Sequence, residues 1–296
     1  MGISRIDLAD KGSPEALVTT ILRLEPELPL PIPVEDLCSQ LDIESIQRLD
    51  TDGFEGGLIT DLERSAGIVL VRDGVPLSRR RFTIGHELGH FLVPTHMPNE
   101  EGRFLCSRRD MRLFSARESN RRARMEVEAN RFSALLLMPP PYLRRSIGKD
   151  PNIEEVFELS SQYLVSKEAM ARSYAEYHPE HVAFVVVQHG RVLRVYKPRK
   201  FPFITARREM PVPSGSIFHK VVSTGSAPSQ VDSCYADTWI DVERGAPAPA
   251  LYEQVCLQAK GFALIMLWLE QAEEDERDDE RTAKQRWKDR ISARFV

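Results

Sequence analysis

Apolar positions in the first part of the chain switch between helical and strand-like spacing. Residues 13–25 carry apolar side chains three and four positions apart, behind a serine that can cap a helix and a proline suited to its first turn. Residues 43–49, 57–61 and 67–71 have the spacing of short strands, separated by turns that contain glycine and aspartate. We therefore expect a scaffold helix and a small sheet before residue 80.

Two longer segments have the pattern of buried helices. Residues 80–92 supply an apolar face made of Phe82, Ile84, Leu88, Phe91 and Leu92. Gly85 and Gly89 lie in the same segment and leave room for a close neighbour. The second segment carries the stripe Ala129, Phe132 and Leu136 and is ended by three prolines at 139–141. Two buried helices are therefore predicted, and the first should stop near Pro94.

Residues 153–176 predict a pair of short helices. They join around Val165 and Ser166, where Ser166 can cap the second helix, and the pair resembles a helix-turn-helix. The second helix offers only Lys167 and Arg172 as clear phosphate contacts. The pattern therefore favours a structural helical pair, and it supports direct DNA binding only weakly.

After residue 178 the spacing becomes that of strands. Residues 183–187 and 192–196 flank a His189-Gly190 turn and predict a hairpin. We expect further short strands around Ile217, Val231 and Trp239, a strand or helix over residues 254–269, and an exposed helix or frayed tail over residues 270–289.

Composition narrows the class of protein without identifying a partner. The chain has 296 residues, 42% of them hydrophobic, and a net charge of -4, which predicts a globular protein with no overall attraction to nucleic acid or anionic membranes. Its four cysteines include no CxxC pair, the N-terminus lacks the apolar core of a secretion signal, and the most apolar run is too short to span a bilayer. These features predict a cytoplasmic protein with reduced thiols and no membrane partner.

One stretch is basic against this acidic background. Between Arg103 and Arg131 there are nine arginines and only four acidic residues. The stretch is either a solvated helix surface or a patch that attracts an acidic substrate or nucleic acid. The sequence leaves both interpretations open.

The helix predicted over residues 80–92 contains the pattern His86-Glu87-x-x-His90. Two histidines four residues apart lie one turn apart on one helix face, so both can reach a single ion. A carboxylate beside them can take a proton from water, which is the general-base role in a metalloprotease. The pattern therefore predicts a zinc metalloprotease site, although two histidines and a carboxylate also serve non-haem iron.

A catalytic zinc usually has three protein ligands, and two candidates compete for the third place. His96 has the spacing seen in metzincins, but the sharp turn that this pattern needs falls on Val93, a β-branched residue that tolerates positive φ poorly. Glu126 on the second buried helix is the preferred candidate, because Asn130 one turn later can receive the outer ring N–H of a ligand histidine. Glu128 points away from that face and is the poorer choice.

The two buried helices also carry a family resemblance. Residues 81–90 and 126–139 read RFTIGHELGH and EVEANRFSALLLMP, and they closely resemble the two signature segments of the ImmA/IrrE family of zinc metallopeptidases. Residues 54–58 and 159–166 are similar to further family features. The resemblance implies an α+β fold with a zincin-like metallopeptidase domain over residues 1–145 and a helix-turn-helix-like extension over residues 146–178. By fold-level analogy it implies a separate C-terminal α+β domain over residues 179–296, GAF-like or regulatory.

The same resemblance implies a function. It implies a cytoplasmic zinc-dependent endopeptidase that cleaves a helix-turn-helix transcriptional repressor, and so derepresses stress-response or mobile-element genes. Carried onto this chain, Zn²⁺ would be held by His86, His90 and Glu126, with Glu87 as the general base. The alternative hypothesis is a non-proteolytic regulatory or binding protein in which the metal only organises the fold.

Overall fold

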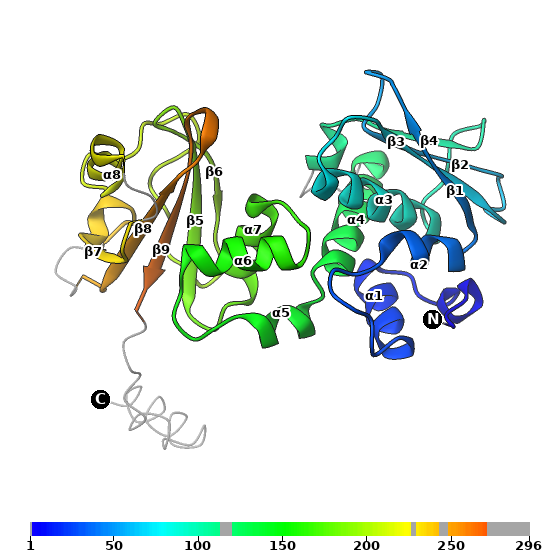
Figure 1. The fold of residues 1–296 in the computed structure, drawn as a ribbon, viewed down its shortest axis with the longest axis horizontal. Helices are drawn as coiled ribbons and strands as arrows, with labels where there is room; N and C mark the ends of the chain where they lie inside the picture. Colours follow the sequence, from blue (N-terminus) through cyan, green and yellow to red (C-terminus); the bar gives the residue numbers. More distant parts are fainter. Residues whose placement is uncertain (1, 113–119, 226–228, 243–247, 271–296) are drawn as a thin grey trace, which may run out of the picture. The chain divides into compact units, whose positions relative to one another are not determined.

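The structure is a computed structural model, and it describes residues 2–112, 120–225, 229–242 and 248–270 (Figure 1). The chain divides into two compact units, Met1–Pro179 with Val195–Lys197, and Glu180–Arg194 with Pro198–Val296. Helices and two sheets occur together, so the mixed α and β class is confirmed. The domain boundaries near residues 145 and 178 and the separate C-terminal domain stay predictions. The tail expected over residues 270–289 lies outside the described residues, Glu270 excepted.

The first unit contains the helices and strands expected from the sequence, together with a further helix that begins at Pro140 and a further strand. Its helices are α1 (Pro14–Leu24), α2 (Val34–Gln40), α3 (Leu77–Leu92), α4 (Arg121–Leu137), α5 (Pro140–Ser146), α6 (Ile153–Gln162) and α7 (Lys167–Tyr177). Its strands are β1 (Ile43–Leu49), β2 (Gly56–Thr60), β3 (Gly67–Arg72) and β4 (Arg103–Cys106), of which the sequence pattern missed β4. The predicted caps form: Ser13 accepts the N–H of Ala16, and Ser166 accepts that of Ala169.

The four strands form one sheet in the order β1-β3-β2-β4. β1 is parallel to β3, whereas β2 is antiparallel to both β3 and β4. β4 is an edge strand, and its Cys106 lies opposite Gly56 of β2. Helix α3 packs against β2 and β3, so this end of the sheet lies beside the helix that carries the two histidines.

Helix α3 packs closely against α4 at its two glycines (Figure 1). A Cβ added at Gly85 would lie 2.7 Å from Ser133 Oγ, and one at Gly89 would lie 3.1 Å from Phe132 and 3.2 Å from the Ala129 backbone. The space that the sequence left beside these glycines is therefore filled by α4. Helix α3 ends at Leu92, close to the predicted end at Pro94. The Arg64 guanidinium donates hydrogen bonds to the carbonyl oxygens of His90 and Phe91 in its last turn.

Gly89→Ala is expected to destabilise the first unit by about 1–3 kcal/mol, because the added methyl group overpacks the contact between α3 and α4. Gly12→Ala is the matched control, since a Cβ there meets nothing within 4 Å. Urea unfolding of the two variants measures the difference. Equal midpoints for Gly89→Ala and the parent protein would show that the helices separate without cost.

The second unit is organised around a five-stranded sheet in the order β6-β5-β9-β8-β7. The strands are β5 (His181–Gln188), β6 (Arg191–Tyr196), β7 (Asp232–Cys234), β8 (Leu251–Leu257) and β9 (Phe262–Leu269). His189 and Gly190 both have positive φ, 49° and 73°, as a tight hairpin turn requires. The sequence left strand and helix open for residues 254–269; β8 and β9 occupy most of this segment, so it is mainly strand. The strand expected around Ile217 is wrong, because this residue caps helix α8 (Phe218–Thr224).

The core of the second unit contains one buried carboxyl group among its described residues, that of Glu253 on β8. It accepts hydrogen bonds from the Ser216 hydroxyl and, at 3.0 Å, from Trp239 Nε1. Burial raises the pKa of this carboxyl group above its ordinary value. The neighbouring donors satisfy the group inside an apolar sheet, which identifies it as a structural polar contact.

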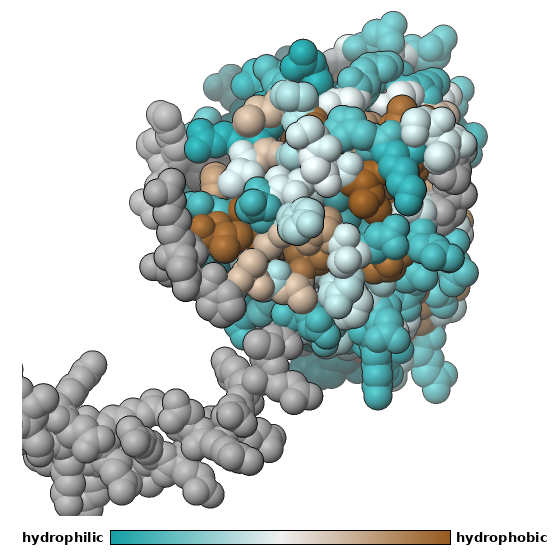
Figure 2. Space-filling model, turned by 90° about the vertical axis from the view of Figure 1, so that its left-hand side faces the viewer, coloured by the Kyte–Doolittle hydropathy of each residue, from teal (hydrophilic) through white to brown (hydrophobic). Residues whose placement is uncertain are grey.

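Apolar side chains on the surface of the second unit are scattered. Figure 2 shows the side of the molecule that carries β7 and α8, where apolar residues lie in separate spots among polar ones. Large exposed apolar side chains of the second unit include Phe203, Val222 and Tyr235. Among the described helices, none is long and apolar enough to cross a bilayer.

Candidate metal centre

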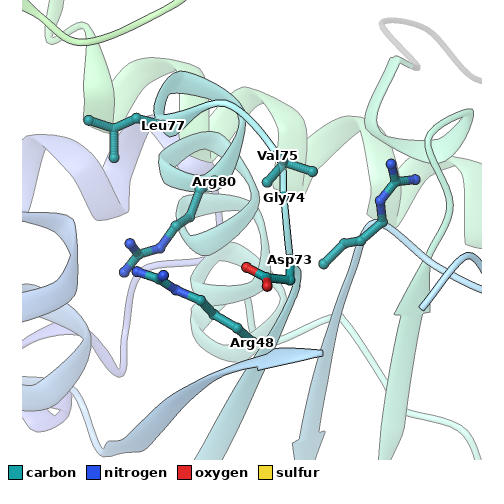
Figure 3. Close-up of a pocket in the computed structure, with 7 residues that line it drawn as sticks. Arg48, Asp73, Gly74, Val75, Leu77 and Arg80 are labelled. Atoms are coloured by element: carbon teal, nitrogen blue, oxygen red, sulfur yellow. The ribbon is translucent and has the colours of Figure 1, made fainter. Parts of the chain in front are cut away.

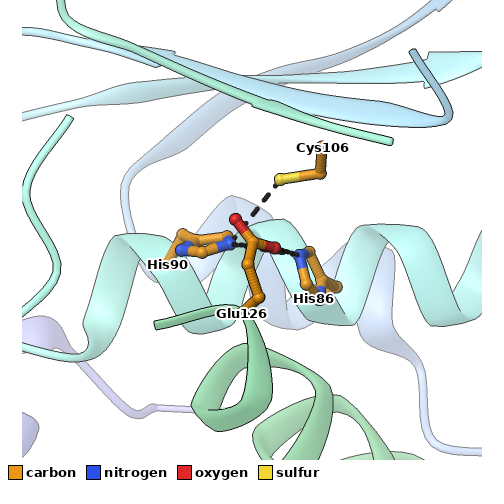
Figure 4. A group of neighbouring side chains, drawn as sticks. All are labelled: His86, His90, Cys106 and Glu126. Atoms are coloured by element: carbon orange, nitrogen blue, oxygen red, sulfur yellow. Dashed lines mark hydrogen bonds and ion pairs between the residues drawn. The ribbon is translucent and has the colours of Figure 1, made fainter. Parts of the chain in front are cut away.

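Two histidines of α3 present ring nitrogens to one point. His86 and His90 are fully buried, and their Nε2 atoms lie 3.1 Å apart (Figure 4). Burial lowers the pKa of His90 to about 4, which favours the neutral ring. Two imidazole nitrogens this close, each facing the other, are arranged so that both could bind one cation.

Glu126 reaches the same point from helix α4. Its Oε2 lies 3.3 Å from His86 Nε2 and 3.5 Å from His90 Nε2, and among the described residues this buried atom has no hydrogen-bond partner. Burial alone would raise the pKa of Glu126, but contacts with the two histidines hold it well below the usual value. The side chain is therefore a carboxylate, with one oxygen free to bind a cation.

These three donors fit a zinc ion. With Zn–N and Zn–O bonds of about 2.0–2.2 Å and tetrahedral angles, neighbouring ligand atoms stand about 3.3–3.5 Å apart. The separations of 3.3 and 3.5 Å fall in this range, and the 3.1 Å between the two histidine nitrogens is about 0.2 Å shorter. The structure thus brings together the three residues predicted as ligands, and their role as ligands stays a proposal.

Asn130 fixes the orientation of the His86 ring. Its Nδ2 donates to the Asp110 carbonyl oxygen at 2.9 Å, which leaves Oδ1 to face His86 Nδ1 at 3.0 Å. Since an amide oxygen only accepts, His86 Nδ1 must carry the proton, and the lone pair of His86 lies on Nε2. This assignment points the free nitrogen toward Glu126, as a metal ligand requires.

Asn130→Ala is expected to weaken zinc binding by about 10- to 100-fold, because nothing would then hold the His86 ring and its tautomer. Competition against a chromophoric chelator measures the affinity. Asn120→Ala, at the exposed start of the same helix, is the control and should leave the affinity unchanged. An affinity equal to that of the parent protein in Asn130→Ala would remove the positioning role.

His96 contacts the ring of His90, the second of the two predicted ligand histidines. It is fully buried, with Nδ1 3.0 Å from His90 Nδ1 and Nε2 3.0 Å from Glu128 Oε2. One consistent set of protons has His90 Nδ1–H donating to His96 and His96 Nε2–H donating to Glu128. Val93 has φ -70°, so the tight turn of the metzincin pattern is absent there. The sequence did not predict these two contacts. Through them, Glu128 and His96 form a chain of hydrogen bonds that ends at the His90 ring.

Glu87 lies beside the ligand group on α3. It is fully buried, its Oε1 has no hydrogen-bond partner among the described residues, and its Oε2 lies 3.8 Å from Cys106 Sγ. Burial, and then the charge of Glu126, raise the pKa of Glu87 well above its ordinary value. A Cβ on Gly56 would lie 2.7 Å from Glu87 Oε1. A glycine at this position of β2 therefore gives the carboxyl group its space.

Cys106 is the site residue that the sequence analysis missed. Its sulfur, one oxygen of Glu126 and one nitrogen of each histidine lie within 4.8 Å of one another, and all four residues are buried. The sequence set the cysteines aside because no two were close in the chain. Only the pairing of β4 with β2 brings this thiol to α3.

A separate surface hollow lies at the N-terminal end of α3. It has a volume of about 160 Å³ and is lined by Arg48, Arg72, Asp73, Gly74, Val75, Leu77 and Arg80 (Figure 3). Arg80 pairs with Glu35 at 2.8 Å and Arg72 with Glu55 at 3.2 Å. Neither histidine lines the hollow, so it is distinct from the candidate metal centre.

Several arginines of the basic segment make ion pairs within the protein. Arg108 pairs with Glu55 at 2.9 Å, and Arg131 contacts both Glu15 and Glu176. Residues 113–119 of the segment lie outside the described residues. Arg109, Arg112, Arg122 and Arg124 of the segment are exposed, so the choice between a solvated surface and a patch for an acidic partner stays open.

The fold of the first unit and its buried donor group can be compared with known protein families. The first unit is a mixed α and β domain built around a buried group of side chains that could hold a metal ion. Residues 40–173 match the Peptidase_M78 model, described as the IrrE N-terminal-like domain, so this segment is similar to that family's domain. The family resemblance found in the sequence is thus confirmed.

Comparison with whole proteins adds little beyond the family. Among solved structures the chain is similar to a Mycobacterium tuberculosis transcriptional regulator, with 13% sequence identity and a TM-score of 0.49, covering 90% of this chain and 79% of that one. No curated protein matches the chain. The function is therefore argued from the site and the family.

Proposed function

We propose that this protein is a zinc-dependent endopeptidase that cleaves a helix-turn-helix transcriptional repressor, and so derepresses stress-response or mobile-element genes. The observation that carries the peptidase proposal is the meeting of His86, His90 and Glu126 at one buried point, with the Glu87 carboxyl group beside them. The repressor as substrate rests on the family resemblance.

The residues of the site have distinct roles in this proposal. The ion would be held by His86, His90 and Glu126. The orientation of the His86 ring would be fixed by Asn130, and that of the His90 ring by His96. When bound, zinc supplies a Lewis acid that polarises a carbonyl group and acidifies water. The pKa of Glu87 would be lowered again by the positive charge of a bound ion, which favours its carboxylate form. That carboxylate would take a proton from the attacking water at Oε1 and pass it to the leaving amide nitrogen as the C–N bond breaks.

The remaining parts of the chain have proposed roles as well. Residues 146–178 would form a helix-turn-helix-like extension, with α6 packed against α7, and residues 179–296 a regulatory domain. The Lys167 ammonium lies 4.0 Å from the centre of the Phe157 ring, and burial lowers the pKa of Arg172. Both cations offered for DNA are thus partly engaged by the protein, which supports a structural pair.

A second candidate function has its own supporting observation. Cys106 adds a fourth possible ligand to the group, and four protein ligands are typical of zinc sites that only stabilise a fold. In that case the protein would regulate by binding, without cutting. Glu87 would then have no role in its biological activity.

Cleavage of a repressor tests the proposed function directly. Zinc-loaded protein is incubated with helix-turn-helix repressors, first those encoded beside its gene, and the products are mapped by mass spectrometry. We expect one discrete cut, and its loss when a chelator removes the metal. Intact repressors after prolonged incubation, or cleavage that persists in chelator, would count against a metallopeptidase.

A further inference from the structure

The Cys106 thiol occupies a place that the proposed chemistry does not use. It comes from β4, it is 1% exposed, and its Sγ lies 3.6 Å from His90 Nε2 (Figure 4). The sulfur also belongs to the group of four donor atoms that lie within 4.8 Å of one another. A buried cysteine is often only a small apolar residue, but this one contacts a ligand histidine and the Glu87 carboxyl group.

The position of the sulfur matches that of a ligand. With a Zn–S bond of about 2.3 Å and a Zn–N bond of about 2.0–2.1 Å, tetrahedral angles place sulfur about 3.5–3.6 Å from nitrogen. The observed distance from Cys106 Sγ to His90 Nε2 is 3.6 Å. Four of the six separations in the group, three among His86, His90 and Glu126 and this one, are therefore close to tetrahedral edges. The other two, from Cys106 Sγ to the donor atoms of His86 and Glu126, are at most 4.8 Å.

We propose that Cys106 is a fourth ligand of the metal held by His86, His90 and Glu126, so that the resting site is closed by the protein. Catalytic zinc sites keep one position open, whereas sites with four protein ligands have none. The inference rests on the proposed metal site and deepens it. Peptide cleavage would require the Cys106 side chain to leave the ion, which makes the peptidase latent at rest.

The place of Cys106 in the sheet suits such a displacement. β4 is four residues long and pairs with β2 along one side, at the edge of the sheet. Its backbone is held by the short pairing with β2 and by the hydrogen bond that Glu55 N donates to the Cys106 carbonyl oxygen at 2.9 Å. Phe104 of the same strand is buried and stacks on the His90 ring, with 4.7 Å between the ring centroids, so the strand is anchored there. A displacement that frees the ion would therefore move the Cys106 end of β4, and it need not unfold α3 and α4, which carry the other three proposed ligands.

Cobalt binding tests the fourth ligand without any reference to cleavage. The full-length reduced protein is titrated with Co²⁺, and its absorption is recorded for the parent protein, Cys106→Ser and Cys234→Ser. We expect an intense thiolate-to-cobalt charge-transfer band in the parent protein and in Cys234→Ser, and its loss in Cys106→Ser. Cys234 lies on β7 in the second unit and is the matched control. Absence of the band from the parent protein, or its presence in Cys106→Ser, would overturn the proposal.

Alkylation of the parent protein gives a second readout that does not depend on a variant folding. Zinc is expected to slow the modification of Cys106 by iodoacetamide, as mapped by peptide mass spectrometry, and to leave that of Cys234 unchanged. Modification of Cys106 that proceeds at a measurable rate without zinc and at the same rate with zinc would contradict ligation.

The outcomes also separate this inference from the proposed function. A charge-transfer band with no repressor cleavage by either the parent protein or Cys106→Ser would keep the four-ligand site and reject the peptidase. Metal-dependent cleavage with no band would keep the peptidase and reject the Cys106 ligand. If both hold, Cys106→Ser should cleave faster than the parent protein, since its site is no longer closed by a thiolate.

Discussion

Glu87→Gln is expected to lower the rate of repressor cleavage by about 10²- to 10⁴-fold, the contribution typical of a general base, while zinc still binds. Glutamine has nearly the shape of glutamate but cannot take a proton at Oε1, the atom that has no hydrogen-bond partner among the described residues. The variant keeps His86, His90 and Glu126, so the metal content should stay at one ion per chain. Cleavage is followed by electrophoresis with the repressor in excess, and metal content by elemental analysis.

A matched control separates the role of Glu87 from a general effect of removing a carboxylate. Glu158→Gln changes an exposed glutamate of α6 and should leave cleavage unchanged. Cleavage by Glu87→Gln at the parent rate would reject the general-base role. If that variant instead loses both cleavage and zinc, Glu87 holds the site together, and the mechanism has to be rewritten.

Glu126→Gln is expected to lower the affinity for zinc by more than the about 10- to 100-fold that loss of an outer contact costs. The substitution removes the negative charge that lies 3.3 Å and 3.5 Å from the two histidine nitrogens. A neutral amide oxygen is a weaker ligand for a divalent ion than a carboxylate. Competition with a chelator of known affinity measures the change, and cleavage should fall with metal occupancy.

Glu128→Gln is the matched control on the same helix. Its carboxylate is 41% exposed and contacts His96, not the point where the ligands meet. A smaller loss of affinity is therefore expected than for Glu126→Gln. An equal or larger loss in Glu128→Gln would mean that the third ligand had been assigned to the wrong glutamate.

If Cys106 closes the site and the protein is a peptidase, the Cys106 side chain has to move before a peptide can be cleaved. Glu87 is adjacent to Cys106, with 3.8 Å between Oε2 and Sγ. If Cys106 binds the ion, its sulfur takes the coordination position that a substrate carbonyl group would need. Regulation of such an enzyme would therefore act on β4, the edge strand that carries Cys106.

Helical periodicity alone was enough to predict α3 and α4 and the faces they bury. Because residues one turn apart share a face, it also predicted that His86 would lie next to His90 and that Glu126 would accompany Asn130. The family resemblance has the same local origin, since both signature segments are single helices. The strand expected around Ile217 failed because a short apolar run does not distinguish a strand from the start of a helix.

Tertiary structure decided what surrounds these local patterns. Cys106 lies beside His90 and Glu87 because β4 pairs with β2 in one particular register. His96 contacts His90 and Glu128 because the loop after α3 folds back toward α4. Register and loop path depend on contacts between residues distant in the chain, and no periodicity records them. The sequence by itself thus determined which helices carry the candidate site, whereas only the packing of a strand and a loop against them decided which further donors meet there.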